Sequence, residues 1–391
     1  MKSTLADAGR RLPAPAQEGA AHSARLAGYI RNAIAAAGGS IGFDRYMELA
    51  QYAPGLGYYN AGASKFGAAG DFVTAPELGP LFARCLARQA AEVLAACGGG
   101  LLEAGPGSGA LAAELLAELQ RLGRLPAEYT LLEVSPELKR RQQERLASAP
   151  CPVRWLDTMP QRFTGLVLAN ELLDAFPVQR FVWRAGELLE QRVGLDGSGG
   201  FVWREQPGSE AAALGATLAS WLADCPEGYV FEWNARALAW IGALAASLWQ
   251  GVALIVDYGY ARREFFHPQR QGGTLLCHYR HHAHDDPFLW PGLNDITASL
   301  DFTALAEAAR QAGLEVRGYA SQAGFLLGCG LEAVLQALPQ EPRSSWLQRS
   351  REALQLTNPG GMGERFKVLA LGRGWELPLR GFAFQDWRGR L

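Results

Sequence analysis

The chain has 391 residues, a formal net charge of −2 and an apolar fraction of 49%. This length predicts two domains, or one large domain with insertions, and this composition is typical of a globular protein with a large core. The balanced charge, with no basic run, argues against nucleic acid as a partner. The six cysteines show no paired spacing and indicate reduced thiols. Residues 1–25 lack the apolar core of a signal peptide, and no run approaches the ~20 apolar residues of a membrane span, so we expect a cytoplasmic protein.

The first hundred residues predict helices around one long loop. We expect a loose tail over 1–20, and the apolar spacing predicts helices over 23–37, 43–52 and 81–97. The loop at 54–82 carries Tyr58, Tyr59, Phe66 and Phe72 among glycines, which indicates either a lid or an ordered connector packed by its aromatic rings. Within it, Asp71 and Glu77 are candidates to close over a cofactor or a substrate. Capping of the helix that follows Pro80 is their alternative role.

Strands and helices alternate from residue 101 onward. Apolar runs predict strands at 101–104, 129–132, 152–155, 166–169 and 251–257, and later at 314–319 and 366–371. Helices are predicted from Ala110, at 136–147, 211–223, 235–249 and 302–312, and within 325–355. Such alternation predicts an α/β fold with a doubly wound sheet that binds ligands at the carboxyl ends of its strands. The period-two pattern at 178–204 predicts a β-hairpin insertion, and a long His-rich loop is expected before Asp301.

These elements suggest three parts along the chain. An N-terminal cap of helices and a glycine-rich aromatic lid is predicted for 1–80, and a core for 81–324 with an insertion at 178–234. Residues 325–391 are predicted to add a helical insertion and then the closing strand of the core.

The stretch LLEAGPGSGAL at 101–111 predicts a strand, a tight turn and a helix. Gly105, Gly107 and Gly109 permit positive φ and leave the backbone open to a ligand. The helix that follows would aim its free N–H groups at that ligand. Glu133 ends the next strand, where a carboxylate can bind ribose hydroxyls.

Glycine spacing alone leaves three interpretations of this turn. GPGSGA satisfies a pattern for dinucleotides such as NAD, and a glycine-rich turn without a ligand is a second interpretation. Glu103 favours the third, S-adenosylmethionine, because a negative charge there suits the ammonium and sulfonium groups of that cofactor and would repel a pyrophosphate. Asp157, Asn170 and Asp257 also lie at predicted strand ends and are further candidates for this site.

With these motifs, the chain resembles the MidA family of methyltransferases, which includes a mitochondrial complex I assembly factor. The resemblance covers most of residues 43–372 and rests on segments such as FGAAGDFVTAPELGPLF at 66–82, LLEVSPELKRRQ at 131–142, LANELLDAFPVQRFV at 168–182 and LNDITASLDFTAL at 293–305. It implies a Rossmann-like class I methyltransferase with a seven-stranded, mostly parallel sheet whose last strand is antiparallel, and S-adenosylmethionine as cofactor. For the mitochondrial relatives it implies methylation of an arginine on a complex I subunit. Two departures are Ser108, where the family's turn has arginine, and FEWNA at 231–235, which lacks Ser-Pro after the acid.

An arginine acceptor would require carboxylates, because its pKa above 12 keeps the guanidinium protonated. Glu171 and Asp174 would share a face if a helical turn followed their strand, so we predict both as substrate clamps. Asn170 is predicted to orient the cofactor or the substrate through its amide. The alternative is that one carboxylate caps a turn and the other is solvated. Asp257 and Tyr258 are expected near the acceptor, although Asp257 could instead satisfy backbone N–H groups.

The His-rich segment at 278–286 fits no zinc spacing, so no metal is predicted. The family resemblance favours His281 on an acceptor surface. We therefore expect an arginine-bearing protein as partner and allow for a homodimer. A small-molecule methyltransferase and a cofactor-binding assembly chaperone without transfer activity are the alternatives.

Overall fold

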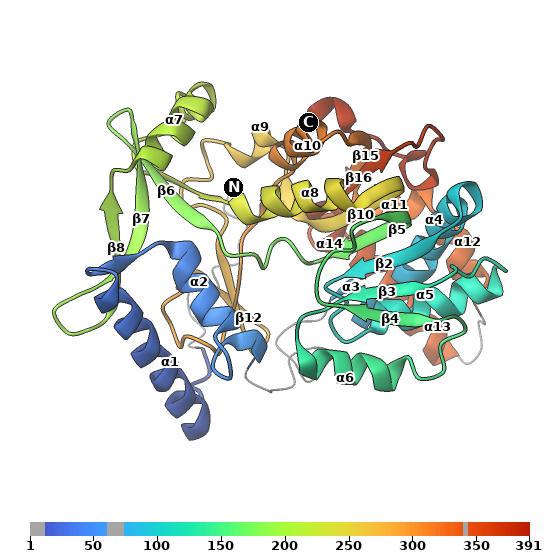
Figure 1. The fold of residues 1–391 in the computed structure, drawn as a ribbon, viewed down its shortest axis with the longest axis horizontal. Coiled ribbons are helices and arrows are strands. Elements are labelled where there is room, and N and C mark those ends of the chain that lie inside the picture. Colours follow the sequence, from blue (N-terminus) through green and yellow to red (C-terminus); the bar gives the residue numbers. More distant parts are fainter. Residues whose placement is uncertain (1–11, 61–73, 339–342) are drawn as a thin grey trace. The chain divides into compact units, whose positions relative to one another are not determined.

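The computed structural model describes residues 12–60, 74–338 and 343–391 (Figure 1). The chain forms two compact units, each assembled from separate stretches of sequence. The first comprises Met1–Phe72, Asp174–Ala237 and Arg262–Leu300, and the second comprises Val73–Leu173, Leu238–Ala261 and Asp301–Leu391. The N-terminal helices therefore belong to the same unit as the insertion, a grouping that the sequence analysis did not predict.

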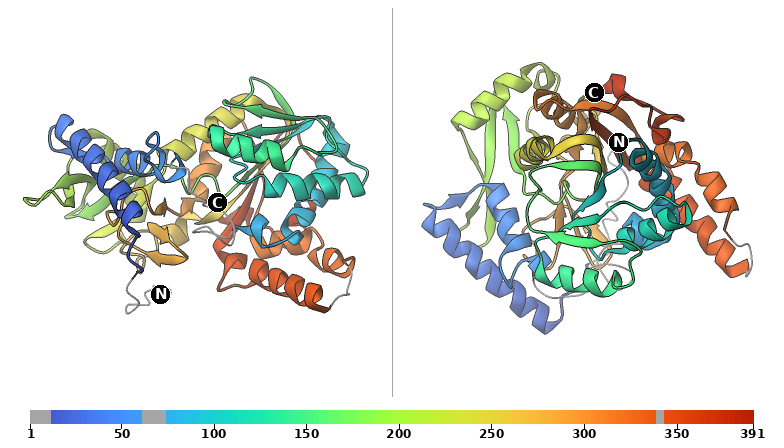
Figure 2. Two further views of the ribbon diagram at one scale, coloured as in Figure 1. Left: turned by 90° about the horizontal axis from the view of Figure 1, so that it is seen from below. Right: turned by 45° about the vertical axis from the view of Figure 1, so that its right-hand side comes forward.

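The second unit is built on a mixed sheet with helices on both faces (Figure 2). Seven of its strands follow the order β15-β16-β10-β5-β2-β3-β4, and the two-residue β14 (Leu300–Asp301) lies off this path. The bounds of the seven are β2 (Gly100–Ala104), β3 (Tyr129–Leu132), β4 (Val153–Leu156), β5 (Phe163–Asn170), β10 (Leu248–Tyr260), β15 (Glu315–Ser321) and β16 (Phe366–Arg373). Neighbours from β10 through β4 are parallel, whereas β16 is antiparallel to β10 and to β15. The α/β fold with an antiparallel last strand is confirmed.

The strand order reverses beside β2. The chain runs outward from β2 to β3 and β4, and then returns to β5 on the other side of β2. Carboxyl ends of strands at such a switch point leave a crevice for ligands. The glycine turn follows β2 and the segment that begins at Glu171 follows β5, so this topology brings the two segments to the same edge of the sheet.

The helices of the second unit largely match the predicted segments. They are α3 (Ala75–Leu78), α4 (Leu81–Cys97), α5 (Ala110–Arg121), α6 (Pro136–Arg145), α10 (Phe302–Gln311), α11 (Gln322–Gly328), α12 (Leu331–Gln336), α13 (Arg343–Thr357) and α14 (Met362–Arg365), with 3-10 turns η2 (Arg380–Phe382) and η3 (Arg388–Arg390). Ser135 and Asp301 cap α6 and α10 through their side chains. Helix α8 (Ala235–Ser247) begins in the first unit and continues in the second. Among the helices in the described ranges, none is long and apolar enough to cross a membrane.

The first unit contains two antiparallel sheets. One has the order β1-β7-β6-β9 with β8 on β7, and the other has the order β12-β11-β13. Their bounds are β1 (Ser40–Ile41), β6 (Gln179–Arg184), β7 (Glu187–Leu195), β8 (Phe201–Gln206), β9 (Tyr229–Trp233), β11 (Leu276–Tyr279), β12 (His282–His284) and β13 (Asp295–Thr297). The helices are α1 (Gln17–Ala36), α2 (Phe43–Tyr52), α7 (Ser209–Leu222), α9 (Arg262–Phe265) and the 3-10 turn η1 (Tyr58–Asn60).

Two sequence expectations are wrong in this unit, and a third is confirmed but incomplete. The predicted hairpin is present as the antiparallel pair of β6 and β7, and it belongs to a five-stranded sheet, because β8 extends it and the distant strands β1 and β9 pair with it. The expected His-rich loop contains three short strands, which are too short to show a clear period-two pattern. Helix α1 begins at Gln17, inside the expected loose tail, and carries Glu18 in its first turn, where a negative charge stabilises a helix.

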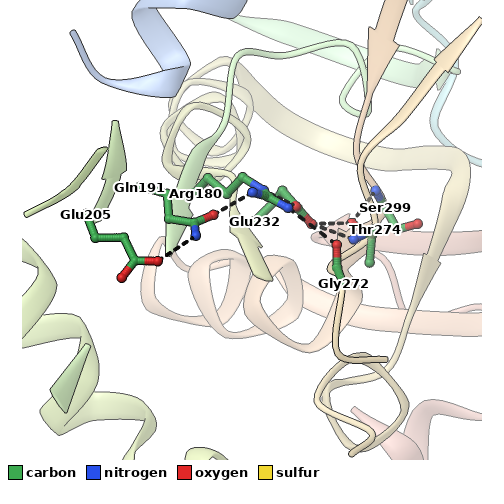
Figure 3. Close-up of polar contacts among 7 residues, drawn as sticks. All are labelled: Arg180, Gln191, Glu205, Glu232, Gly272, Thr274 and Ser299. Carbon is green, nitrogen blue, oxygen red and sulfur yellow. Dashed lines mark hydrogen bonds and ion pairs between the residues drawn. The ribbon is translucent and has the colours of Figure 1, made fainter. Parts of the chain in front are cut away.

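A buried polar cluster links β6, β7 and β9 of this unit to the segment before β11 (Figure 3). Arg180 Nε lies 3.2 Å from Glu232 Oε1, and Arg180 also donates to Gln191 Oε1 at 2.5 Å. Glu232 Oε2 accepts hydrogen bonds from the backbone N–H of Thr274 at 2.6 Å and from its hydroxyl at 2.9 Å. The carboxylate, which is almost fully buried, therefore joins two sheet strands to a distant chain segment.

Candidate cofactor site

The turn between β2 and α5 has the backbone conformation that the sequence predicts. Gly105, Gly107 and Gly109 have φ of 67°, 53° and 78°, values that residues with a side chain rarely adopt. A Cβ on Gly105 would lie 2.7 Å from Leu172 Cδ1, so the end of that side chain would have to shift. The turn therefore requires glycine for its backbone angles, and the segment after β5 lies close against it.

Glu133, at the end of β3, is held in place by helix α6. Its Oε1 accepts the backbone N–H of Ser135 at 2.8 Å, and its Oε2 accepts the side-chain amide of Gln142 at 3.1 Å. Burial raises the pKa of Glu133, and these two hydrogen bonds oppose the rise. The carboxylate is thus positioned beside the glycine turn, where its remaining lone pairs can accept hydroxyl groups.

Glu103 lies near the end of β2 and is only 2% exposed. Tyr129 donates its hydroxyl to Glu103 Oε2 at 2.7 Å. Burial raises the pKa of Glu103 to about 7, the Tyr129 hydrogen bond lowers it, and the charge of Glu133 raises it further. A cation nearby would reverse this shift, because it favours the ionised carboxylate. The site therefore suits a positively charged ligand.

Asn170 is the last residue of β5, and Glu171 follows it directly. Asn170 Nδ2 donates to Glu171 Oε1 at 3.2 Å, whereas Asn170 Oδ1 is a buried acceptor with no hydrogen-bond partner among the described residues. Glu171 has φ of 49°, a left-handed conformation that is costly for a residue with a side chain. Its Oε1 also accepts the backbone N–H of Ala75 at 3.3 Å. The buried amide oxygen fits a site that is completed by a hydrogen-bond donor on a ligand.

Glu77 lies against the glycine turn. It accepts the hydroxyl of Ser108, and Arg145 on α6 donates to that hydroxyl at 3.0 Å. The alternative role of Glu77 as a cap for the following helix is wrong, because Glu352 Oε1 accepts the Leu81 N–H at 2.6 Å. Asp71 lies outside the described residues.

The other predicted residues of the second unit have mainly structural contacts. Asp157, just after the end of β4, is largely exposed and pairs with Lys139. Asp257 is 1% exposed and accepts the N–H groups of Leu173 at 3.0 Å and Tyr258 at 2.9 Å. Asp257 therefore accepts hydrogen bonds from backbone N–H groups, which is the alternative role that the sequence indicated. The ring of Tyr258 packs edge-on against Phe366.

Two predicted residues belong to the first unit. Asp174 is 4% exposed, and its backbone oxygen accepts the Ala298 N–H at 3.1 Å. The predicted shared helical face of Glu171 and Asp174 is wrong, since bends and turns, with no helix, follow β5. His281 is exposed at the tip of the β11–β12 hairpin, where it and Arg280 both have positive φ. Positive φ at both central residues is typical of a tight hairpin turn.

Sequence reasoning missed several residues around the turn. Gln142 contacts both Glu133 and the backbone of Gly107, and Val134, beside Glu133, is 71% exposed although it is apolar. Exposure of Val134 has no signal in the sequence, and Gln142 differs in no visible way from its neighbour Gln143.

This arrangement distinguishes between the candidate ligands. Buried acids at the ends of β2 and β3 would repel a pyrophosphate but can receive an ammonium, a sulfonium and ribose hydroxyls. The sheet order, the antiparallel last strand and this site define the class of S-adenosylmethionine-dependent methyltransferases with a Rossmann-like core.

Comparisons with known proteins agree. The sequence model of a family described as "Putative S-adenosyl-L-methionine-dependent methyltransferase" matches residues 85–320, and the chain belongs to this family. "Protein arginine methyltransferase NDUFAF7, mitochondrial" of Danio rerio is 30% identical over 85% of this chain and 83% of its own. The human protein of that name is 27% identical over 85% of this chain and 80% of its own.

A solved structure supports both fold and cofactor. A protein from Burkholderia thailandensis bound to S-adenosyl-homocysteine is 44% identical to this chain and superposes with a TM-score of 0.93, covering 97% of this chain and 100% of that one. The resemblance inferred from the sequence is thus confirmed, and S-adenosylmethionine is the cofactor. The dinucleotide alternative is excluded by this family membership.

The pKa of Glu103 leads to a prediction about cofactor affinity. A bound cation favours the ionised form, so below about pH 7 binding must displace a proton from Glu103. We therefore expect affinity for S-adenosylhomocysteine, whose ammonium is positive, to rise with pH up to about 7 and then level off. Calorimetric titration in buffers of different ionisation enthalpy measures the released proton. Glu103→Gln should remove this proton release, and an unchanged release in that variant would contradict the assignment.

Proposed function

We propose that this methyltransferase transfers the methyl group to an arginine side chain of a protein. The names of the curated relatives support this substrate class, because proteins called arginine methyltransferases match 85% of the chain. The structural observation that carries the proposal is the position of the Glu171 carboxylate after β5.

Glu171 has the features of a positioned substrate carboxylate. It follows β5, directly across the switch point from the glycine turn, and its neighbour Leu172 contacts the turn at Gly105. Its left-handed backbone directs the chain away from a regular strand or helix, and such strain is concentrated at functional sites. The hydrogen bonds from Ala75 and Asn170 to Oε1 orient this carboxylate. An oriented carboxylate suits the planar, charge-assisted binding of a guanidinium.

The chemistry explains why a carboxylate is needed. When bound, S-adenosylmethionine supplies an activated methyl group. The residues of the chain must orient an arginine nitrogen and accept the charge of a group whose pKa is above 12. Glu171 would hold the guanidinium and receive the proton that the methylated nitrogen loses. Asn170 would orient the cofactor or the substrate through its amide oxygen.

The experiment combines substrate identification with a substitution. Purified protein is incubated with S-adenosylmethionine carrying a deuterated methyl group and an extract of cells that lack the gene, and the labelled residues are identified by mass spectrometry. We expect label on arginine. Glu171→Gln should lower this labelling by at least about 100-fold, because general acid–base groups contribute on this scale. S-adenosylhomocysteine affinity should change less than about threefold.

Glu144→Gln is the matched control, since Glu144 is an exposed carboxylate of the same unit that pairs only with Arg140 among the described residues. It should leave both affinity and labelling unchanged. Label found only on small molecules would replace the protein substrate by a small one. Intact cofactor affinity without any transfer would favour the assembly chaperone.

Two further expectations also stay predictions. The names of the curated relatives include the word mitochondrial, while the sequence of this chain led us to expect the cytoplasm. A homodimer is likewise proposed, and sedimentation analysis of the purified protein tests it.

A further inference from the structure

We propose that Gln142 is a positioning residue of the cofactor site, which holds the Glu133 carboxylate and the glycine turn in the geometry that the cofactor ribose requires. Gln142 lies on α6 and is fully buried. It touches the two segments that form the site, although it lies outside the glycine turn and the ends of the strands.

The side-chain amide of Gln142 makes three hydrogen bonds. Its Nε2 donates to Gly107 O at 2.8 Å and to Glu133 Oε2 at 3.1 Å. Its Oε1 accepts the indole N–H of Trp155, on β4, at 3.0 Å. An indole nitrogen can only donate, so this contact determines which end of the amide is oxygen. Trp155 thereby points both amide hydrogens toward the turn and the carboxylate.

Helix α6 is packed directly against the turn. A Cβ on Gly109 would lie 3.4 Å from Gln142 Cγ and 3.6 Å from Gln142 Cα. One turn further along the helix, Arg145 donates to Ser108 of the same turn at 3.0 Å. The turn is therefore held from α6 at two points, and Gln142 is the one that also reaches Glu133.

The two oxygens of Glu133 are held by different groups. Ser135 N–H binds Oε1, and Gln142 binds Oε2, so the plane of the carboxylate is defined. Each oxygen retains a lone pair for a ribose hydroxyl. The Gln142 hydrogen bond also lowers the pKa of Glu133 against the effect of burial, and so it favours the ionised form that accepts hydroxyl groups.

The test compares Gln142→Met with Gln143→Met. Gln143 is the next residue of the same helix and is exposed, so it is a matched control of identical chemistry. The probes are S-adenosylhomocysteine and its 2′-deoxy analogue, measured by calorimetry. A lost hydrogen bond to a charged group predicts that Gln142→Met weakens S-adenosylhomocysteine binding about tenfold or more, but binding of the deoxy analogue less than about threefold. Gln143→Met should bind both probes as the unaltered protein does.

A second readout separates positioning from a structural role. Without the Gln142 hydrogen bond, the pKa of Glu133 rises further. In the Glu103→Gln background, where Glu103 no longer titrates, the pH at which S-adenosylhomocysteine affinity falls should therefore move upward in Gln142→Met and stay unchanged in Gln143→Met. Equal losses for both probes, or an unchanged pH profile, would show that Gln142 supports only the fold. Unchanged affinity would also overturn the proposal.

If Gln142→Met does not fold, Trp155→Phe provides the second variant. It keeps an aromatic ring on β4 and removes the donor that orients the Gln142 amide. We expect a smaller loss, about two- to fivefold, that is again selective for the probe with both ribose hydroxyls. Equal affinity of Trp155→Phe and the unaltered protein for both probes would count against the proposed orientation.

Discussion

Gly107→Val should weaken S-adenosylhomocysteine binding at least about 100-fold while the protein stays folded. Gly107 has φ of 53°, and a β-branched residue there carries strain on the order of 1–3 kcal/mol or rearranges the turn. Its carbonyl also accepts the amide of Gln142, so a rearranged turn loses its contact with α6. Either outcome removes the bare backbone surface that the ligand needs. Calorimetry measures the affinity, and circular dichroism with thermal unfolding checks the fold.

Gly123→Val separates backbone strain from loss of the site. Gly123 follows α5 in the same unit and has φ of 63°, and a Cβ there would meet no atom of the described residues within 4 Å. This variant should lose a similar amount of stability and keep its affinity. If Gly107→Val bound S-adenosylhomocysteine as tightly as Gly123→Val does, the glycine turn would not be the cofactor site.

The core of the fold could be predicted because its signals are local. Strands buried on both faces, such as Val252 to Val256 in β10, give continuous apolar runs, and the caps Ser135 and Asp301 lie beside the helices they begin. The sheet of the first unit could not be predicted in the same way. Its strand β1 has two residues, and it pairs with β7 about 150 positions later, at Ser40↔Gly194 and Ile41↔Val193. Such pairing depends on tertiary packing rather than on a local period.

The site was predictable where chemistry coincides with a strand end. Glu103, Glu133 and the three glycines follow this rule, whereas Gln142 does not, because a buried glutamine in a helix rich in polar residues has no distinguishing pattern. The assumption of a helical turn after β5 failed because only the structure shows the left-handed Glu171. The absence of Ser-Pro after Glu232 has little effect on the local fold, because another residue caps the helix that follows. Asn234 Oδ1 accepts the Ala237 N–H at 2.8 Å, and asparagine caps helices as well as serine does.

Glu232→Ala should destabilise the first unit by roughly 3–5 kcal/mol, the usual consequence of removing one partner of a buried ion pair. The side chains of Arg180 and Glu232 are only 13% and 1% exposed. The variant would leave the Arg180 guanidinium without its carboxylate, and the Thr274 N–H without its acceptor (Figure 3). The stacking of Arg180 on Trp203, at 4.5 Å, offsets only part of this loss. Urea unfolding followed by fluorescence measures the change.

Two comparisons test whether the loss of stability arises because the Arg180–Glu232 ion pair is buried. Glu144→Ala removes an exposed partner of Arg140, with the side chains of Arg140 and Glu144 60% and 66% exposed, and should cost less than about 1 kcal/mol. Combining Arg180→Met with Glu232→Leu removes both charges and should recover much of the stability lost in Glu232→Ala, because no uncompensated charge is left buried. The carboxylate also excludes a side chain at Gly273, whose Cβ would lie 2.4 Å from Glu232 Oε1. A loss in Glu232→Ala no larger than that in Glu144→Ala would mean that hydration of Arg180 replaces the ion pair, and that this cluster does not stabilise the unit.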